Sequence, residues 1–200
     1  MKKLTFAVLC ALAGLSAQAA QVTSLPGGTV LAMPALNYFG TGPQNLAPGI
    51  DWSSAYGASV YGYTGGYGFA GNGFWSGLSM AGTNDTTSTM MLAFTQAVTG
   101  VGAFFNYAPQ NYGTATIAAY DAGSNLIEST TLTFTTNGGT NQGEFHGFLE
   151  NTASISYFTM TGAYMGATDF TVVAVPEPET YGMLLAGLGL LGVAARRRKA

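Results

Sequence analysis

Apolar and polar residues alternate in short runs along the second half of the chain. In residues 89–96, Met90, Leu92 and Phe94 fall on one side of an extended backbone. Successive side chains of a strand point to opposite faces, so this period indicates a half-buried strand of an antiparallel sheet. Similar segments, bounded by Gly, Asn or Pro, give seven predicted strands: residues 89–96, 98–108, 114–121, 126–136, 143–150, 154–161 and 169–175.

These segments contain no credible helical period, which predicts an all-β fold, an antiparallel β-sandwich, for a body spanning residues 20–175. The clearest alternation lies in residues 126–136, where Leu132 and Phe134 face one way and threonines face the other. We therefore expect this strand to be central, with both apolar residues in the core.

The first part of the body is less regular. Residues 25–48 contain four prolines and predict a loop-rich segment with at most two strands. Residues 55–82 are rich in Gly, Tyr and Phe. One interpretation is an exposed aromatic platform that stacks on sugars through Tyr63, Tyr67 or Trp75. The other, which we favour, is a hairpin whose aromatic side chains fill the core while glycines form turns and bulges.

The N-terminus, residues 1–19, has the three parts of a secretory signal peptide: a positive start, an apolar stretch and small residues before the cut. These parts are Lys2 and Lys3, residues 4–15, and Ala17 with Ala19. We expect signal peptidase to cleave after Ala19. Cys10 leaves with the signal, so the mature chain has no cysteine and forms no disulfide.

The C-terminus, residues 176–200, combines a short motif, an apolar run and a basic end. The motif is Pro176, Glu177 and Pro178, the apolar run covers residues 181–195, and the basic cluster is Arg196, Arg197, Arg198 and Lys199. The prolines keep the motif extended, which is how processing enzymes bind peptides. As a helix, the run spans about 22 Å of a hydrocarbon core about 30 Å thick, with the basic cluster at the cytoplasmic side.

This tail resembles the PEP-CTERM sorting tail, which exosortase-type transpeptidases recognise in Gram-negative bacteria. The stretches SVYGYTGGYGFAGNGFWSG, VGAFFNYAP, TIAAYDA, ESTTLTF and DFTV also look like the body of a recurring PEP-CTERM domain family, similar to a jelly-roll sandwich. The resemblance implies transient anchoring in the inner membrane by a short transmembrane helix, then display at the cell surface or release. It implies no established ligand. An ordinary C-terminal anchor that is never removed is the alternative.

Charge excludes whole classes of partner. Residues 20–195 contain no Lys or Arg, whereas all nine acidic residues lie in that stretch. A body without cations cannot neutralise phosphates, so nucleic-acid binding is excluded and nucleotide chemistry is disfavoured.

Candidate catalytic chemistry is sparse. His146 is the single histidine, so neither a Cys/His zinc site nor a serine triad has its usual parts, and we expect His146 on a sheet surface. Glu144 and Glu150 would lie about 20 Å apart on one strand, too far for a glycosidase pair, which needs about 5–9.5 Å. Cross-strand pairs stay open, either Asp121 with Glu128 or Glu150 with Asp169.

No cofactor is expected, although a structural Ca²⁺ ion is an alternative, with Asp51 and Asp169 as candidate ligands. We expect a non-enzymatic protein with a structural or adhesive role in an exopolysaccharide or biofilm matrix. A carbohydrate-binding module is the alternative, and a glycan hydrolase is a distant third. The expected partners are signal peptidase and an exosortase, with exopolysaccharide as a further candidate.

Overall fold

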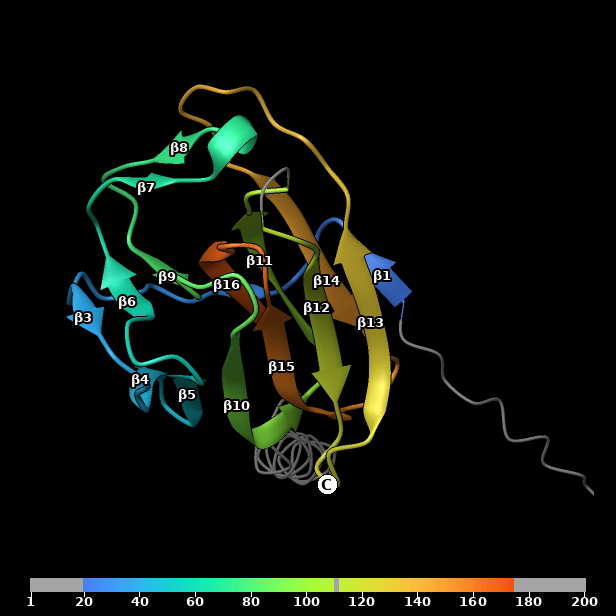
Figure 1. Ribbon diagram of the computed structural model, residues 1–200. Helices are drawn as coiled ribbons and strands as arrows, with labels where there is room; N and C mark the ends of the chain where they lie inside the picture. Colours follow the sequence, from blue (N-terminus) through green and yellow to red (C-terminus); the bar gives the residue numbers. More distant parts are fainter. Residues whose placement is uncertain (1–19, 110–111, 175–200) are drawn as a thin grey trace, which may run out of the picture.

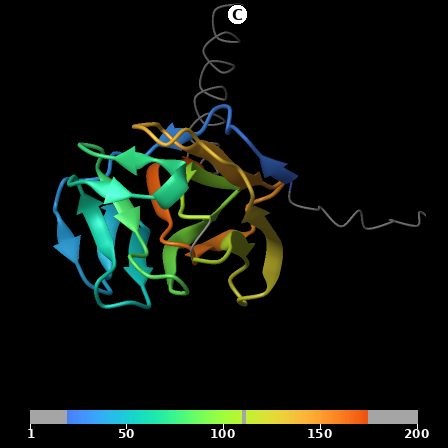
Figure 2. The same ribbon diagram turned by 45° about the horizontal axis from the view of Figure 1, so that its top comes forward.

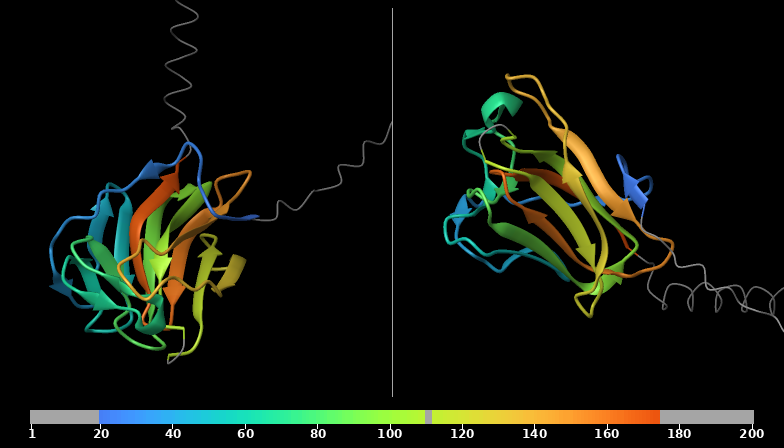
Figure 3. Two further views of the ribbon diagram at one scale, coloured as in Figure 1. Left: turned by 90° about the horizontal axis from the view of Figure 1, so that it is seen from above. Right: turned by 45° about the vertical axis from the view of Figure 1, so that its right-hand side comes forward.

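The computed structural model describes residues 20–109 and 112–174, which form two antiparallel sheets packed face to face (Figures 1 and 3). This confirms the predicted all-β antiparallel sandwich. The eight-stranded sheet contains, in spatial order, β1 (Ala20–Val22), β14 (Glu144–Leu149), β11 (Gly100–Asn106), β16 (Gly166–Val173), β9 (Met80–Gly82), β6 (Val60–Tyr63) and β3 (Tyr38–Phe39), with β2 (Thr29–Val30) paired to β16.

The six-stranded sheet has the order β13 (Leu126–Leu132), β12 (Ala115–Tyr120), β15 (Ile155–Thr161), β10 (Thr89–Val98), β5 (Ile50–Ser54) and β4 (Gln44–Ala47). Strands β7 (Tyr67–Gly68) and β8 (Phe74–Trp75) form a separate hairpin around the short 3₁₀ helix η1 (Ala70–Asn72). Figure 2 shows this hairpin on the same side of the molecule as β3 and β6.

The main core lies between the two sheets, and the alternation of the sequence fills it. Met90, Leu92 and Phe94 of β10 are buried in the core as predicted. Across the sandwich, the ring of Phe158 on β15 lies 6.2 Å from that of Phe105 and 6.1 Å from that of Phe148, measured between centroids. Each of the seven strands predicted from residue 89 onward has a counterpart in the structure.

The strand predicted to be central is at an edge. β13 ends at Leu132 and pairs only with β12 among the strands that the structure describes. Leu132 is buried as expected, but Phe134 lies beyond the strand and is half-buried. The alternating threonines face solvent, and β-branched residues suit an exposed strand face as well as a central one. The prediction of a central position was therefore wrong.

The first part of the chain has more strand than expected. Three short strands, β2, β3 and β4, lie within residues 25–48, one more than predicted. The Gly/aromatic segment forms the β7–β8 hairpin, and its rings build a second, smaller core around Phe69 and Trp75, both fully buried. Within the described residues, no helix is long and apolar enough to cross a membrane.

Candidate functional site

The outer face of the six-stranded sheet carries its side chains in rows, because residues paired across antiparallel strands point to the same side. The first row contains Asp51, Ala93, Tyr157, Tyr120 and Leu126. The second contains Ser53, Met91, Thr159, Ala118 and Ser129. The third contains Thr89, Thr161, Thr116 and Thr131. An aromatic row therefore lies beside two rows dominated by hydroxyl groups.

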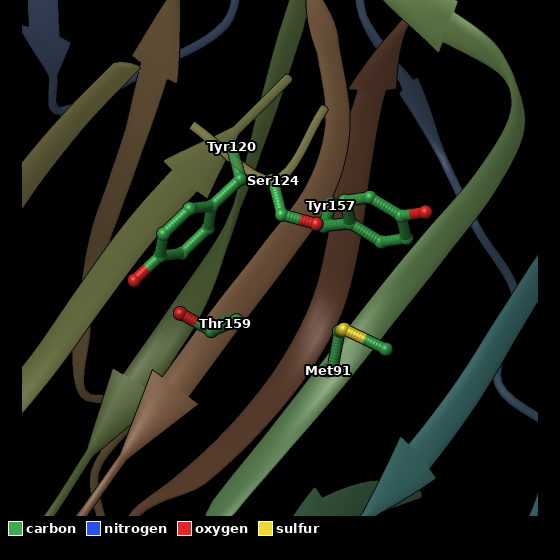
Figure 4. A pocket seen from close by; sticks show the side chains of 5 residues that line it. All are labelled: Met91, Tyr120, Ser124, Tyr157 and Thr159. Carbon is green, nitrogen blue, oxygen red and sulfur yellow. The ribbon is translucent and has the colours of Figure 1, made fainter. Parts of the chain in front are cut away.

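A groove of about 330 Å³ opens on this face where β10, β12 and β15 meet (Figure 4). It is lined by Met91, Tyr120, Ser124, Tyr157 and Thr159. The two tyrosines are directly paired across β12 and β15, and Ser124 lies between them in the view of Figure 4. The tyrosine rings and the neighbouring hydroxyl groups of the groove could contact a ligand that has an apolar ring face surrounded by hydroxyl groups.

The turn that brings Ser124 to the groove is held by Asp121. Its Oδ1 accepts a hydrogen bond from the backbone N–H of Asn125 at 2.8 Å, and Asn125 Nδ2 donates to Oδ2 at 2.9 Å. These bonds lower the pKa of Asp121, with the side chain of Asn125 as the largest cause. Ser124 adopts a left-handed backbone (φ 62°), which the tight turn imposes. The Asp121 carboxylate therefore stabilises the turn through its hydrogen bonds with Asn125.

The residues predicted to contact glycans lie elsewhere. Trp75 is completely buried and Tyr67 is 8 % exposed, while Tyr63 is half-buried. Their rings form a continuous chain of contacts in which Tyr63 touches Tyr67, Tyr67 touches Phe69 and Phe69 touches Trp75. The hydroxyl of Tyr67 accepts a hydrogen bond from Asn84 N–H at 3.0 Å, and burial raises its pKa. In this conformation Trp75 presents no face to solvent.

The two candidate calcium ligands are not brought together. Asp51 lies on β5 of one sheet, where Asn45 Nδ2 donates a hydrogen bond to its Oδ1 at 3.0 Å. Asp169 lies on β16 of the other sheet, exposed at the bulge against β11, with a left-handed backbone (φ 50°). Among the residues that the structure describes, no three acidic, His or Cys side chains gather in one place.

The remaining carboxylates do not form the cross-strand pairs that the sequence left as candidates for a glycosidase. Glu144 lies 3.5 Å from Nε2 of His146, on the same strand. His146 is half-buried rather than fully exposed, and burial lowers its pKa while Glu144 opposes that shift. Glu150 is separated from Asp169 by β11, and its electrostatic neighbour is Glu128 instead.

Tyr120 and Tyr157 were not singled out from the sequence. In residues 154–161, Phe158 and Met160 alternate with Tyr157, Thr159 and Thr161, so the period already placed an aromatic residue on a hydroxyl-rich outer face. The pairing of Tyr157 with Tyr120 depends on the register between β12 and β15, and this register cannot be derived from the sequence of a single protein.

Comparison with known proteins identifies the tail. The family described as PEP-CTERM protein-sorting motif matches residues 174–199. The chain is therefore an exported protein that exosortase sorts to the cell surface. The match covers the tail and does not extend over the body. The predicted signal peptide and the sorting residues 176–200 lie outside the described residues.

No curated protein matches the sequence. Among solved structures, a fucose binding module of Streptococcus pneumoniae is 14 % identical with a TM-score of 0.33, and the alignment covers 48 % of this chain and 71 % of that one. The lectin domain of lectinolysin, solved with Lewis B antigen, is 9 % identical with a TM-score of 0.32, and the alignment covers 80 % and 94 %. With TM-scores this low, neither likeness identifies a ligand for this chain.

Proposed function

We propose that the body is a non-enzymatic adhesive module that holds this surface protein to neutral polysaccharide of the extracellular or biofilm matrix. The observation that carries the proposal is the groove between Tyr120 and Tyr157, with the hydroxyl groups of Ser124 and Thr159 beside the rings. Tyrosine rings contact the apolar faces of sugars at a low cost in side-chain entropy, and hydroxyl groups exchange hydrogen bonds with the sugar edges.

The charge of the body favours a neutral ligand over an acidic one. The rows beside the groove contain one carboxylate, Asp51, at the far end of the first row, and no other side chain that is charged at neutral pH. No Lys or Arg in residues 20–195 could pair with uronate, sulfate or phosphate groups. An acidic polysaccharide would therefore be repelled by the body, because residues 20–175 contain seven acidic residues and no Lys or Arg, whereas a neutral polysaccharide would not.

The proposed adhesive role is compatible with a jelly-roll-like sandwich that is exported and contains no disulfide. Transient anchoring by the tail would place the body outside the inner membrane before an exosortase removes the C-terminal helix. A purely structural matrix role needs the same fold but no groove. Substitution of Tyr120 and Tyr157 should therefore reduce retention on polysaccharide only if the role is adhesive.

The test is retention of the exported protein on insoluble neutral and acidic polysaccharides. Tyr120→Ser and Tyr157→Ser, singly and together, should reduce retention on the neutral polymer at least tenfold and leave the melting temperature within a few degrees. Tyr56→Ser is the matched control, because Tyr56 is 40 % exposed and lies outside the groove lining. Retention that is unchanged in the double variant would refute the groove as the adhesive site.

A further inference from the structure

Glu150 carries a buried carboxylate oxygen without a partner. The residue is only 6 % exposed, and its Oε1 has no hydrogen-bond partner among the described residues. Burial is the main cause that raises the pKa of Glu150, and the nearby charge of Glu128 adds to it. Burying a carboxylate costs folding free energy unless a cation or several hydrogen-bond donors face it. A positive group beside Glu150 would offset that cost.

Both carboxylates lie at the open edge of the sandwich, where β13 of one sheet faces β1 of the other. Glu128 is paired with Ala119, whose side chain is in the core, so Glu128 points to the inner side of the edge strand. Thr130 points the same way and its Oγ1 donates a hydrogen bond to Oε1 of Gln21 on β1 at 3.1 Å. Figure 1 shows β1 lying beside β13.

The start of β1 is brought to the same place. Ala20 is paired with Leu149, the residue immediately before Glu150. Ala20 also precedes Gln21, which is bonded to Thr130, two residues from Glu128. These pairings bring the start of β1 to the edge of the sandwich where both carboxylates lie.

The chain offers few other cations for this site. Residues 20–195 contain no Lys or Arg. The single histidine, His146, is a neighbour on β14, but its ring already contacts Glu144 and Gln21. Removal of a signal peptide after Ala19 would convert the amide nitrogen of Ala20 into an α-ammonium group, which is positive at neutral pH.

We propose that Glu150 and Glu128 form a cation site whose occupant is the α-ammonium group of Ala20, created by signal-peptide cleavage. The proposal rests on cleavage after Ala19 and is independent of the groove. Before cleavage the site holds two carboxylates without a counter-charge, and after cleavage it holds an ion pair. Processing thereby fixes β1 to the edge of the sandwich and stabilises the exported form over its precursor.

Selective acetylation provides the test, because the only primary amines left after cleavage at Ala19 are the α-amino group and Lys199. A chain with Lys199→Gln would be expressed, so that exported protein has one primary amine whether or not the tail is still attached. That protein would be acetylated, and its melting temperature compared with that of the untreated sample. We expect acetylation to lower the melting temperature by about 2–4 °C. Glu150→Gln should abolish this difference, whereas the exposed-site control Asp169→Asn should retain it. An equal shift in Glu150→Gln would overturn the proposal.

A second measurement does not depend on stability. Pairing with carboxylates raises the pKa of an α-amino group above its ordinary value of about 7.7–8.0, so less of the reactive neutral amine exists at pH 7. Amine labelling at pH 7 should therefore be slower, at least threefold, in the parent than in Glu150→Gln or Glu128→Gln. The other titratable groups on this edge, Glu144 and His146, are common to all samples.

Three results would count against the ammonium as occupant. Equal labelling rates in parent and variants would do so, as would a mature N-terminus at any residue other than Ala20. A melting temperature that rises with added Ca²⁺ in the parent, but not in Glu150→Gln, would assign the site to a metal ion instead.

Discussion

The ring of Phe134 stacks on the imidazole of His146, with centroids 5.2 Å apart and planes inclined by 11°. Phe134 follows β13, and His146 lies on β14 of the opposite sheet. Tyr107 also contacts Phe134: its ring meets the Phe134 ring edge-on with centroids 5.1 Å apart, and its hydroxyl donates to the Phe134 carbonyl at 2.8 Å. The segment beyond β13 is thus held across the sandwich by aromatic contacts rather than by strand pairing.

This contact predicts a loss of stability in weak acid. Burial lowers the pKa of His146 in the folded protein, with Glu144 acting in the opposite direction. The unfolded chain, whose histidine pKa is about 6.5, therefore takes up the proton first. Stability is fully present above the unfolded pKa and is lost as pH falls through it toward the folded pKa.

Urea unfolding at pH 7 and pH 5.5 measures this effect. His146→Gln should make the free energy of unfolding less dependent on pH across that interval, because the titrating group is gone. Glu144→Gln should make the loss larger than in the parent, because the compensating charge is removed. Parallel pH profiles for all three proteins would show that His146 does not control stability in this range.

Alanine substitutions at Trp75 and Phe74, two neighbouring aromatic residues of β8, test whether the Gly/aromatic segment is a core or an exposed platform. Trp75 is fully buried against Phe69, with centroids 4.9 Å apart, whereas Phe74 is 41 % exposed. Trp75→Ala should cost about 3–5 kcal/mol of unfolding free energy, since it leaves a cavity in the second core. Phe74→Ala should cost about 1 kcal/mol or less. A stable Trp75→Ala protein that had lost polysaccharide retention would favour the exposed-platform interpretation instead.

The sequence predicted the strands well because one buried face imposes a strict period. Met90, Leu92 and Phe94 had to share a face, and burial of that face fixed β10. The order of strands was less accessible: alternating threonines in β13 suit an edge or a centre, and only long-range pairing with β12 decides between them. The groove was missed for the same reason, since Tyr120 and Tyr157 meet only through the register of β12 with β15.

Asp85 should stabilise the turn between β9 and β10 through its ionised carboxylate. Its Oδ2 accepts hydrogen bonds from the N–H groups of Thr87 and Ser88 at 3.0 and 2.7 Å. These bonds, with Thr87 first, lower its pKa from 3.8 to about 2. The contribution is present above the unfolded pKa and is lost as pH falls toward 2. Because the residue is only half-buried and solvent screens its charge, Asp85→Asn should cost only about 1 kcal/mol or less at pH 7.

Thermal unfolding from pH 7 down to pH 2 would test that assignment. The difference in stability between Asp85→Asn and the parent should shrink as the pH approaches 2, where the parent carboxyl is protonated as well. Asp169→Asn is the control, because Asp169 is exposed and its carboxylate accepts no hydrogen bond among the described residues; Thr171 Oγ1 donates to its backbone carbonyl instead. A difference that stays constant with pH would mean that the amide disturbs the turn for steric reasons.

The final prediction concerns the sorting step, for which the family match over residues 174–199 supplies the basis. A transpeptidase that reads an extended peptide needs the motif, whereas the apolar run only holds that motif at the membrane. Glu177→Ala or Pro176→Ala should therefore trap the protein in the membrane fraction, with the body folded and unchanged in melting temperature. Thr180→Ala, just outside the motif, is the matched control and should be sorted normally.

Intact-mass measurement distinguishes the possible outcomes. Sorted parent protein should begin at Ala20 and lack the basic cluster that ends in Lys199, while the trapped variants should retain that cluster. Release of both motif variants with the tail removed would mean that the enzyme recognises something other than the motif. Recovery of the parent protein at the surface with Arg196, Arg197 and Arg198 still attached would establish a permanent anchor, because cleavage upstream of the apolar helix necessarily removes them.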